Sequence, residues 1–139
     1  MDADARGFGG LACRGIRGAI TTGNGGAEAV SEATVELLQA LVDANGCRSE
    51  DLAAAIFTVT PDLAGTNPAA AARRTGWDGV PLLVVQEHAG DTGLSGCIRV
   101  LLLWNTTTPQ DQVRHRYLRE AARLRPDLVT ARDAGQGAT

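Results

Sequence analysis

The sequence contains no lysine, so all 13 of its basic side chains are arginines. This absence excludes catalysis through a lysine Schiff base, a lysine-anchored pyridoxal phosphate and the lysine of a Walker A nucleotide site. Every fixed cation is instead a planar guanidinium, which can hold a carboxylate through two parallel hydrogen bonds. The composition therefore favours small anionic ligands, although drift toward arginine explains the surface positions equally well.

The chain also lacks a surplus of positive charge, a long apolar run and paired cysteines. A formal net charge of -3 argues against binding to nucleic acid. The longest apolar run, residues 100–104, is far shorter than the roughly 20 residues that cross a bilayer, so no membrane association is expected. Cys13, Cys47 and Cys97 form no C-x-x-C motif, and the first residues do not resemble a secretory signal. These features predict reduced, mostly buried thiols in a cytoplasmic protein.

The 139 residues predict one domain, over residues 12–128, with a flexible leader at 1–11 and a tail at 129–139. Strands are expected at residues 13–22, 53–60, 80–87 and 97–105, and helices at 27–45, 69–75 and 109–116. Residues 117–124 keep a helical period, but a final strand remains an alternative. This order predicts an α/β (α+β) fold with a mixed sheet and helices on one face. We expect partner subunits to cover the other face.

Several motifs have ordinary structural explanations. Residues 7–12 spell G-x-G-x-x-A, but a strand is expected after them, whereas a dinucleotide site needs a strand before and a helix after. The glycines at 23–26 are more typical of a plain turn than of a phosphate-binding loop. His88 and His115 lack a metal-ligand pattern, so no metal site is expected.

Charged side chains stand where the strand pattern calls for apolar ones. Arg17 interrupts the first expected strand, Glu87 ends the third, and Arg99 lies within the most hydrophobic one. Because buried charge is costly unless it is paired or functional, two explanations are open. One is an internal Arg–Glu pair, and the other is an arginine-lined pocket for a small anion. Arg73 and Tyr117 are additional candidate donors for such a pocket.

A series of short blocks, taken together, resembles the AroH-class chorismate mutases. They are RGIRGAITT at 14–22, TPDL at 60–63, GW at 76–77, VP at 80–81, QE at 86–87, CIRV at 97–100, PQDQVRH at 109–115, YL at 117–118 and LRPDL at 124–128. The blocks occur in the family's order and leave only the leader and the tail uncovered.

The resemblance implies a homotrimer with a pseudo-α/β-barrel at its centre, of RidA-like architecture, and active sites in the clefts between subunits. It also implies the Claisen rearrangement of chorismate to prephenate, on the route to phenylalanine and tyrosine, without a metal, a cofactor or a covalent intermediate. Chorismate is a dianion whose enolpyruvyl ether must fold over the ring before the bonds exchange. Negative charge then grows on the ether oxygen, so a cation placed there in advance favours the transition state.

Each site residue takes its expected role from this resemblance. Arg99 is the cation at the ether oxygen, and Glu87 accepts from the ring hydroxyl and holds Arg99 in place. Arg17 grips a carboxylate, to which Tyr117 adds a hydrogen bond.

Residues near the rim are also expected to bind substrate. Arg73 comes from the neighbouring subunit, and Arg125 helps the tail to close over the site. Leu83 and Val84 are expected to contact the substrate from the third predicted strand.

Three positions depart from the family pattern. Asn67 stands in place of a phenylalanine, Ala70 in place of a lysine, and Val84 in place of a cysteine. The first two changes are expected to loosen the rim, and the third to remove a side-chain contact near the hydroxyl. A non-catalytic module that binds small anions, in which these departures have abolished turnover, is therefore one alternative. Another is a trimeric enamine or imine hydrolase of the RidA kind, which shares the trimeric architecture and an arginine that clasps a substrate carboxylate.

Overall fold

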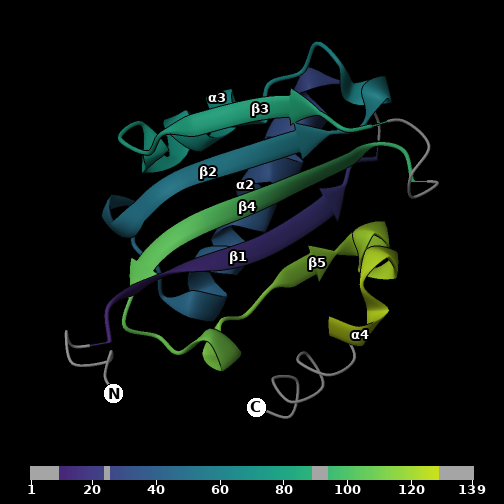
Figure 1. Cartoon of the computed structure of the whole chain (residues 1–139). Helices are drawn as coiled ribbons and strands as arrows, with labels where there is room; N and C mark the ends of the chain where they lie inside the picture. The colour runs from purple at the N-terminus through teal and green to yellow at the C-terminus, as the bar shows by residue number, and fades with distance from the viewer. Residues whose placement is uncertain (1–9, 24–25, 89–93, 129–139) are drawn as a thin grey trace.

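The protein is described by a computed structural model that covers residues 10–23, 26–88 and 94–128. Five strands form a single mixed sheet in the order β3-β2-β4-β1-β5 (Figure 1). They are β1 (Ala12–Thr21), β2 (Leu52–Val59), β3 (Leu82–Gln86), β4 (Cys97–Thr106) and β5 (Arg116–Leu118). The central strand β4 runs antiparallel to β1 and β2, whereas β5 is parallel to β1 and β3 is parallel to β2. The predicted mixed sheet is confirmed.

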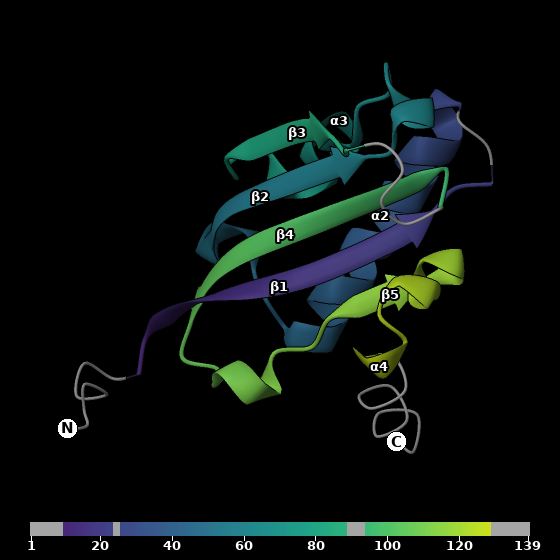
Figure 2. The ribbon, with the colours of Figure 1, turned by 45° about the vertical axis from the view of Figure 1, so that its right-hand side comes forward.

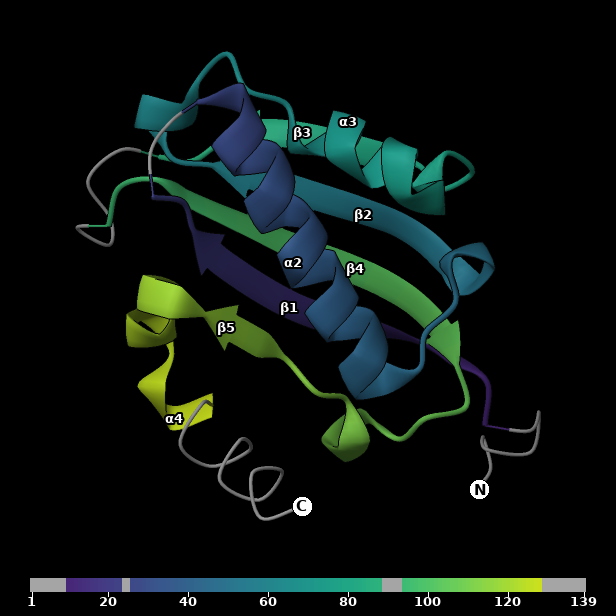
Figure 3. The same ribbon diagram turned by 180° about the vertical axis from the view of Figure 1, so that it is seen from behind.

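The longer helices lie on one face of this sheet. α2 (Ala27–Asn45) crosses the central strands, and the short α3 (Pro68–Ala72) lies against the β2–β3 side; both are behind the sheet in Figure 2 and in front of it in Figure 3. α4 (Pro126–Leu128) and the 3-10 segment η5 (Arg119–Leu124) lie beyond β5. Shorter helical turns are η1 (Ser49–Asp51), η2 (Pro61–Leu63), η3 (Arg73–Trp77) and η4 (Gln110–Gln112).

The core forms between α2 and the sheet. α2 buries one side, on which Val30, Leu37 and Leu41 pack against β-strand residues, as its 3.6-residue apolar period predicts. A methyl group on Gly18 would lie 2.8 Å from Leu41 Cδ1, so glycine is needed where β1 passes beneath the helix. The helix ends at Gly46, whose left-handed backbone (φ 70°) directs its N–H to the Val42 carbonyl at 2.7 Å.

The opposite face of the sheet, which we call the open face, carries the side chains that alternate with the core residues. On it Leu83, Val85 and Leu101 expose 56%, 41% and 37% of their surfaces. Large apolar side chains in such a group are typical of a surface that a partner covers.

The segment after Pro109 differs from the prediction. A helix was expected over residues 109–116, but only η4 is helical and the chain then extends into β5. Val113 is fully buried in the main core, whereas Tyr117 belongs to a separate small cluster on the other side of the sheet. Pairing with the edge of β1 therefore prevails over a helical spacing that would place both side chains together.

Other predictions fall on the remaining segments. Cys47 and Cys97 are buried, but Cys13 is exposed, which corrects its expected place in the core. Residues 1–9 of the predicted leader and the whole tail at 129–139 lie outside the described residues. None of the described helices is long and apolar enough to cross a membrane.

Candidate active site

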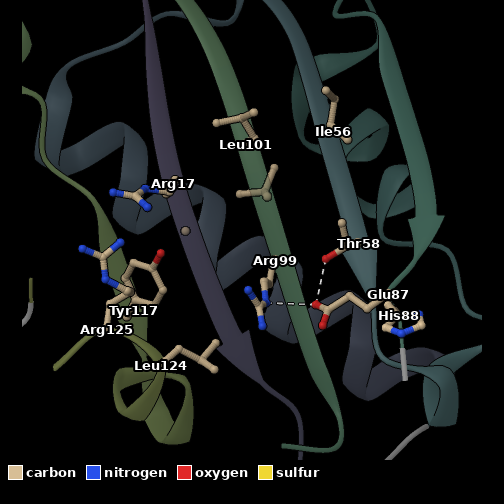
Figure 4. A pocket seen from close by; sticks show the side chains of 12 residues that line it. Arg17, Ile56, Thr58, Glu87, His88, Arg99, Leu101, Tyr117, Leu124 and Arg125 are labelled. Atoms are coloured by element: carbon tan, nitrogen blue, oxygen red, sulfur yellow. Dashed lines mark hydrogen bonds and ion pairs between the residues drawn. The ribbon is translucent and has the colours of Figure 1, made fainter. Parts of the chain in front are cut away.

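A cavity of about 530 Å³ opens on the open face of the sheet (Figure 4). Its wall is formed by four strands (β1, β2, β4 and β5), by the two residues that follow β3, and by the last residue of η5 with the one after it. It is lined by Arg17, Gly18, Ile56, Thr58, Glu87, His88, Arg99, Val100, Leu101, Tyr117, Leu124 and Arg125.

Strand register explains why residues so distant in sequence meet here. Arg99 lies on the central strand, opposite Ala19 of β1 on one side and Thr58 of β2 on the other. Arg17 pairs with Leu101, so it lies one step along the same face. Because side chains alternate between faces, the charged groups that interrupt three apolar patterns reach one surface.

Glu87 and Arg99 form the first polar group of the cavity. Arg99 Nε lies 3.0 Å from Glu87 Oε2, although its N–H direction does not line up as a hydrogen bond. Thr58 Oγ1 donates to the same Oε2 at 2.9 Å. Glu87 Oε1 can therefore accept from a ligand. The Arg99 side chain keeps 37% of its surface exposed, so the predicted Arg–Glu pair and the predicted pocket coexist.

Arg17, Tyr117 and Arg125 gather on the other side of the cavity (Figure 4). Arg125 also holds Asp127, through Nε at 3.1 Å and Nη2 at 2.9 Å. These hydrogen bonds, and the nearby Tyr117, raise the pKa of the Arg125 guanidinium. This wall therefore carries two guanidinium groups, one of which is engaged by a neighbouring carboxylate.

The charge of the lining suits an anionic guest. Three arginines and one glutamate leave the lining with an excess of two positive charges. The arginines stand on both sides of the space, so a ligand with two separated carboxylates can be held from two directions.

Cys97 lies close to Glu87 and Arg99 but is not a nucleophile. It is 1% exposed, and burial, reinforced by the charge of Glu87, raises the pKa of its thiol to about 11. Arg99 acts in the opposite direction, because it favours the thiolate. At neutral pH the side chain is therefore a neutral thiol that packs beneath the site.

The described residues contain no group of three or more His, Cys, Asp or Glu side chains arranged to hold a metal ion. The polar groups of the cavity are instead cations and hydrogen-bonding groups suited to an organic anion.

The model of the family "Chorismate mutase type I" matches residues 13–128. The chain belongs to the type I chorismate mutase family. The chorismate mutase AroH of Thermus thermophilus is 58% identical over 119 residues, which cover 85% of this chain and 98% of that protein. The chorismate mutase AroH of Bacillus subtilis is 41% identical over 116 residues, covering 83% and 91%.

A solved structure of a relative is also similar. A chorismate mutase from Clostridium thermocellum superposes with a TM-score of 0.74 at 36% identity, covering 77% of this chain and 96% of that one. These findings confirm the resemblance to the AroH-class chorismate mutases and favour it over the imine hydrolase alternative.

The cavity brings together five of the eight predicted site residues. They are Arg17, Glu87, Arg99, Tyr117 and Arg125. Arg73 is exposed on η3 and Leu83 on the open face, and neither lines the cavity of the single chain.

Val84 packs against the core, because it alternates with Leu83 and Val85 along β3. Its side chain therefore lies on the core side of β3 in the single chain, and the expected contact of this position near the substrate hydroxyl stays a prediction.

The other two departures concern α3. Asn67 caps this helix, since its Oδ1 accepts from the backbone N–H groups of Ala69 at 3.1 Å and Ala70 at 3.3 Å. Neither Asn67 nor Ala70 lines the cavity. Asn67 thus has a local structural role here, as its position before Pro68 predicts.

Sequence reasoning missed several lining residues, of which Thr58 and His88 are polar. Leu101 was within reach of prediction, since it lies two residues after Arg99 on a strand and so shares its face. Thr58 was not, because its place beside Glu87 depends on the pairing of β2 with β3 and β4.

Replacing Thr58 with valine should lower kcat about fivefold in a chorismate mutase assay, because a lost hydrogen bond of roughly 1 kcal/mol would leave the Glu87 carboxylate less well oriented. Thr58→Ser is the matched control, since it keeps the hydroxyl. Equal kcat values for the valine and serine variants, with melting temperatures unchanged, would contradict the role of Thr58.

Proposed function

We propose that the chain converts chorismate to prephenate in this cavity, through its own side chains. The observation that supports this most directly is the Arg99–Glu87 pair beside a cavity whose opposite wall carries Arg17 and Arg125. The arrangement matches an anionic substrate that has one hydroxyl and two carboxylates.

Arg99 supplies the main electrostatic effect. As the C–O bond breaks ahead of C–C bond formation, negative charge grows on the ether oxygen, and the guanidinium stabilises it more than it stabilises the ground state. Glu87, which accepts a hydrogen bond from Thr58, holds Arg99 from one side, so little reorganisation is needed during the reaction.

The remaining groups select the reactive conformer. Arg17 and Tyr117 bind one carboxylate, while Glu87 Oε1 accepts from the ring hydroxyl. Holding the ends of the molecule in this way favours the folded enolpyruvyl ether and lowers the entropic part of the barrier. Arg125 adds positive charge at the mouth of the cavity, where it would exchange Asp127 for substrate.

The active form is proposed to be a homotrimer with sites between subunits. The exposed apolar side chains of the open face, which include Leu83, Val85 and Leu101, support burial by another copy. Arg73 would reach a neighbour's cavity from its exposed position on η3. A cytoplasmic location remains a prediction from the cysteine usage.

Purified protein should consume chorismate, followed in the ultraviolet, and yield prephenate with no added metal or cofactor. Light scattering on the same sample should give three times the chain mass. Absence of turnover, together with tight binding of a bicyclic transition-state mimic, would point instead to the non-catalytic module.

A further inference from the structure

The strand that carries Tyr117 is too short to fix its own register. β5 has three residues, which pair from Gly18↔Arg116 to Ile20↔Leu118. In this register Tyr117 lines the cavity and Leu118 packs against the core. A shift of the pairing by one residue would move each side chain to the opposite face of the sheet. Contacts outside the strand pairing must therefore hold this segment in place.

One such contact joins the strand directly to Arg17. The backbone N–H of Arg17 donates to Nδ1 of His115 at 3.0 Å, one position before the first paired residue of β5. The imidazole thus takes the place of a backbone carbonyl at the end of the parallel pairing. Accepting at Nδ1 requires the tautomer that is protonated at Nε2.

A second contact holds the preceding residue to the end of α2. Asn45 Oδ1 accepts from the Arg114 N–H at 2.8 Å, and Asn45 Nδ2 donates to the Arg114 carbonyl at 2.8 Å. The same Nδ2 also donates to the Leu41 carbonyl at 3.0 Å, in the last turn of the helix. The Asn45 side chain therefore forms hydrogen bonds with both the N–H and the carbonyl of Arg114.

We infer that Asn45 and His115 are positioning residues that hold β5 in register and present Arg17 and Tyr117 to the substrate. Neither of them lines the cavity, so they act through the residues that do. The inference rests on the proposed function, in which Arg17 and Tyr117 bind a carboxylate whose charge changes little during the reaction. Loss of either positioning residue should therefore weaken binding more than it slows the chemical step.

Kinetics of four variants test this role. Asn45→Ala and His115→Leu should each raise KM about tenfold and change kcat less than about threefold, since tenfold corresponds to the loss of roughly 1.4 kcal/mol of binding. His115→Asn should restore a KM near that of the wild type, because Oδ1 can accept where Nδ1 does. Gln39→Ala is the control for Asn45, since Gln39 lies on the exposed side of α2 and bonds only within the helix, to Asp43.

A second measurement does not depend on activity. In uniformly 15N-labelled protein, a scalar coupling across the hydrogen bond should connect the Arg17 amide nitrogen with His115 Nδ1, and it should vanish in His115→Leu. Wild-type turnover with unchanged KM in folded Asn45→Ala and His115→Leu, or absence of the coupling in the wild type, would overturn the inference. Absence of wild-type turnover would overturn the proposed function instead, while the coupling would still report whether His115 holds Arg17.

Discussion

Replacing Arg99 with citrulline should lower kcat by at least 10²–10³-fold, which is the scale of losing one preorganised donor to a developing oxyanion. Citrulline keeps the shape of the side chain and most of its hydrogen-bonding groups but removes the charge. KM should change far less, since the charge it would stabilise is absent from the ground state. Steady-state kinetics of a semisynthetic variant measure both constants.

The control for this experiment is Arg48→Gln, because Arg48 is an exposed arginine that pairs with Glu50 and Asp51, outside the cavity. Its kcat should equal that of the wild type. A citrulline variant with near-normal turnover and an intact fold would refute the role given to Arg99. The chemistry would then depend on conformer selection by the other residues.

The second large effect is expected at Arg17. Arg17→Ala should raise KM by roughly 10–100-fold, because a hydrogen bond to a charged group is worth about 1.5–3 kcal/mol. The carboxylate that we propose Arg17 binds would keep its charge throughout the reaction, so kcat should fall much less. Initial rates over a wide range of chorismate concentration separate the two constants.

Arg14→Ala provides a control on the same strand. Arg14 donates from Nε to the Thr108 carbonyl at 3.2 Å and does not line the cavity. Both of its kinetic constants should remain near the wild-type values. If Arg17→Ala lowered kcat with KM unchanged, Arg17 would act in the chemical step instead.

The prominent elements of the fold were predictable because their signals are local. The period of apolar residues and the glycine at its end gave α2 the bounds that the structure shows, Ala27–Asn45. The first four strands were located to within one or two residues by their apolar runs, whereas residues 117–124 were compatible with either a helix or a strand. A charged residue is easy to recognise in an otherwise apolar strand, which is how the sequence singled out Arg17, Glu87 and Arg99.

The segment that ends the sheet shows where local signals fail. Strand propensity depends strongly on context, so contacts distant in sequence decide whether this segment forms a helix at 109–116 or extends into a strand at 116–118. Here β1 offers an open edge, and Asn45 and His115 hold the chain against it. Asn45 is 69 residues away from Arg114 in the sequence, and His115 is 98 residues away from Arg17.

By itself, the sequence determined the mixed sheet, the helix that covers it, the family and the candidate arginines of the site, since each depends on residue type and short-range order. Only the tertiary structure decided on which face of the sheet each side chain lies. It placed Thr58 beside Glu87 and Val84 in the core, because strand register assigns alternate residues to opposite sides of a sheet. Register is set by pairing between distant segments, and residue order along one strand does not specify it.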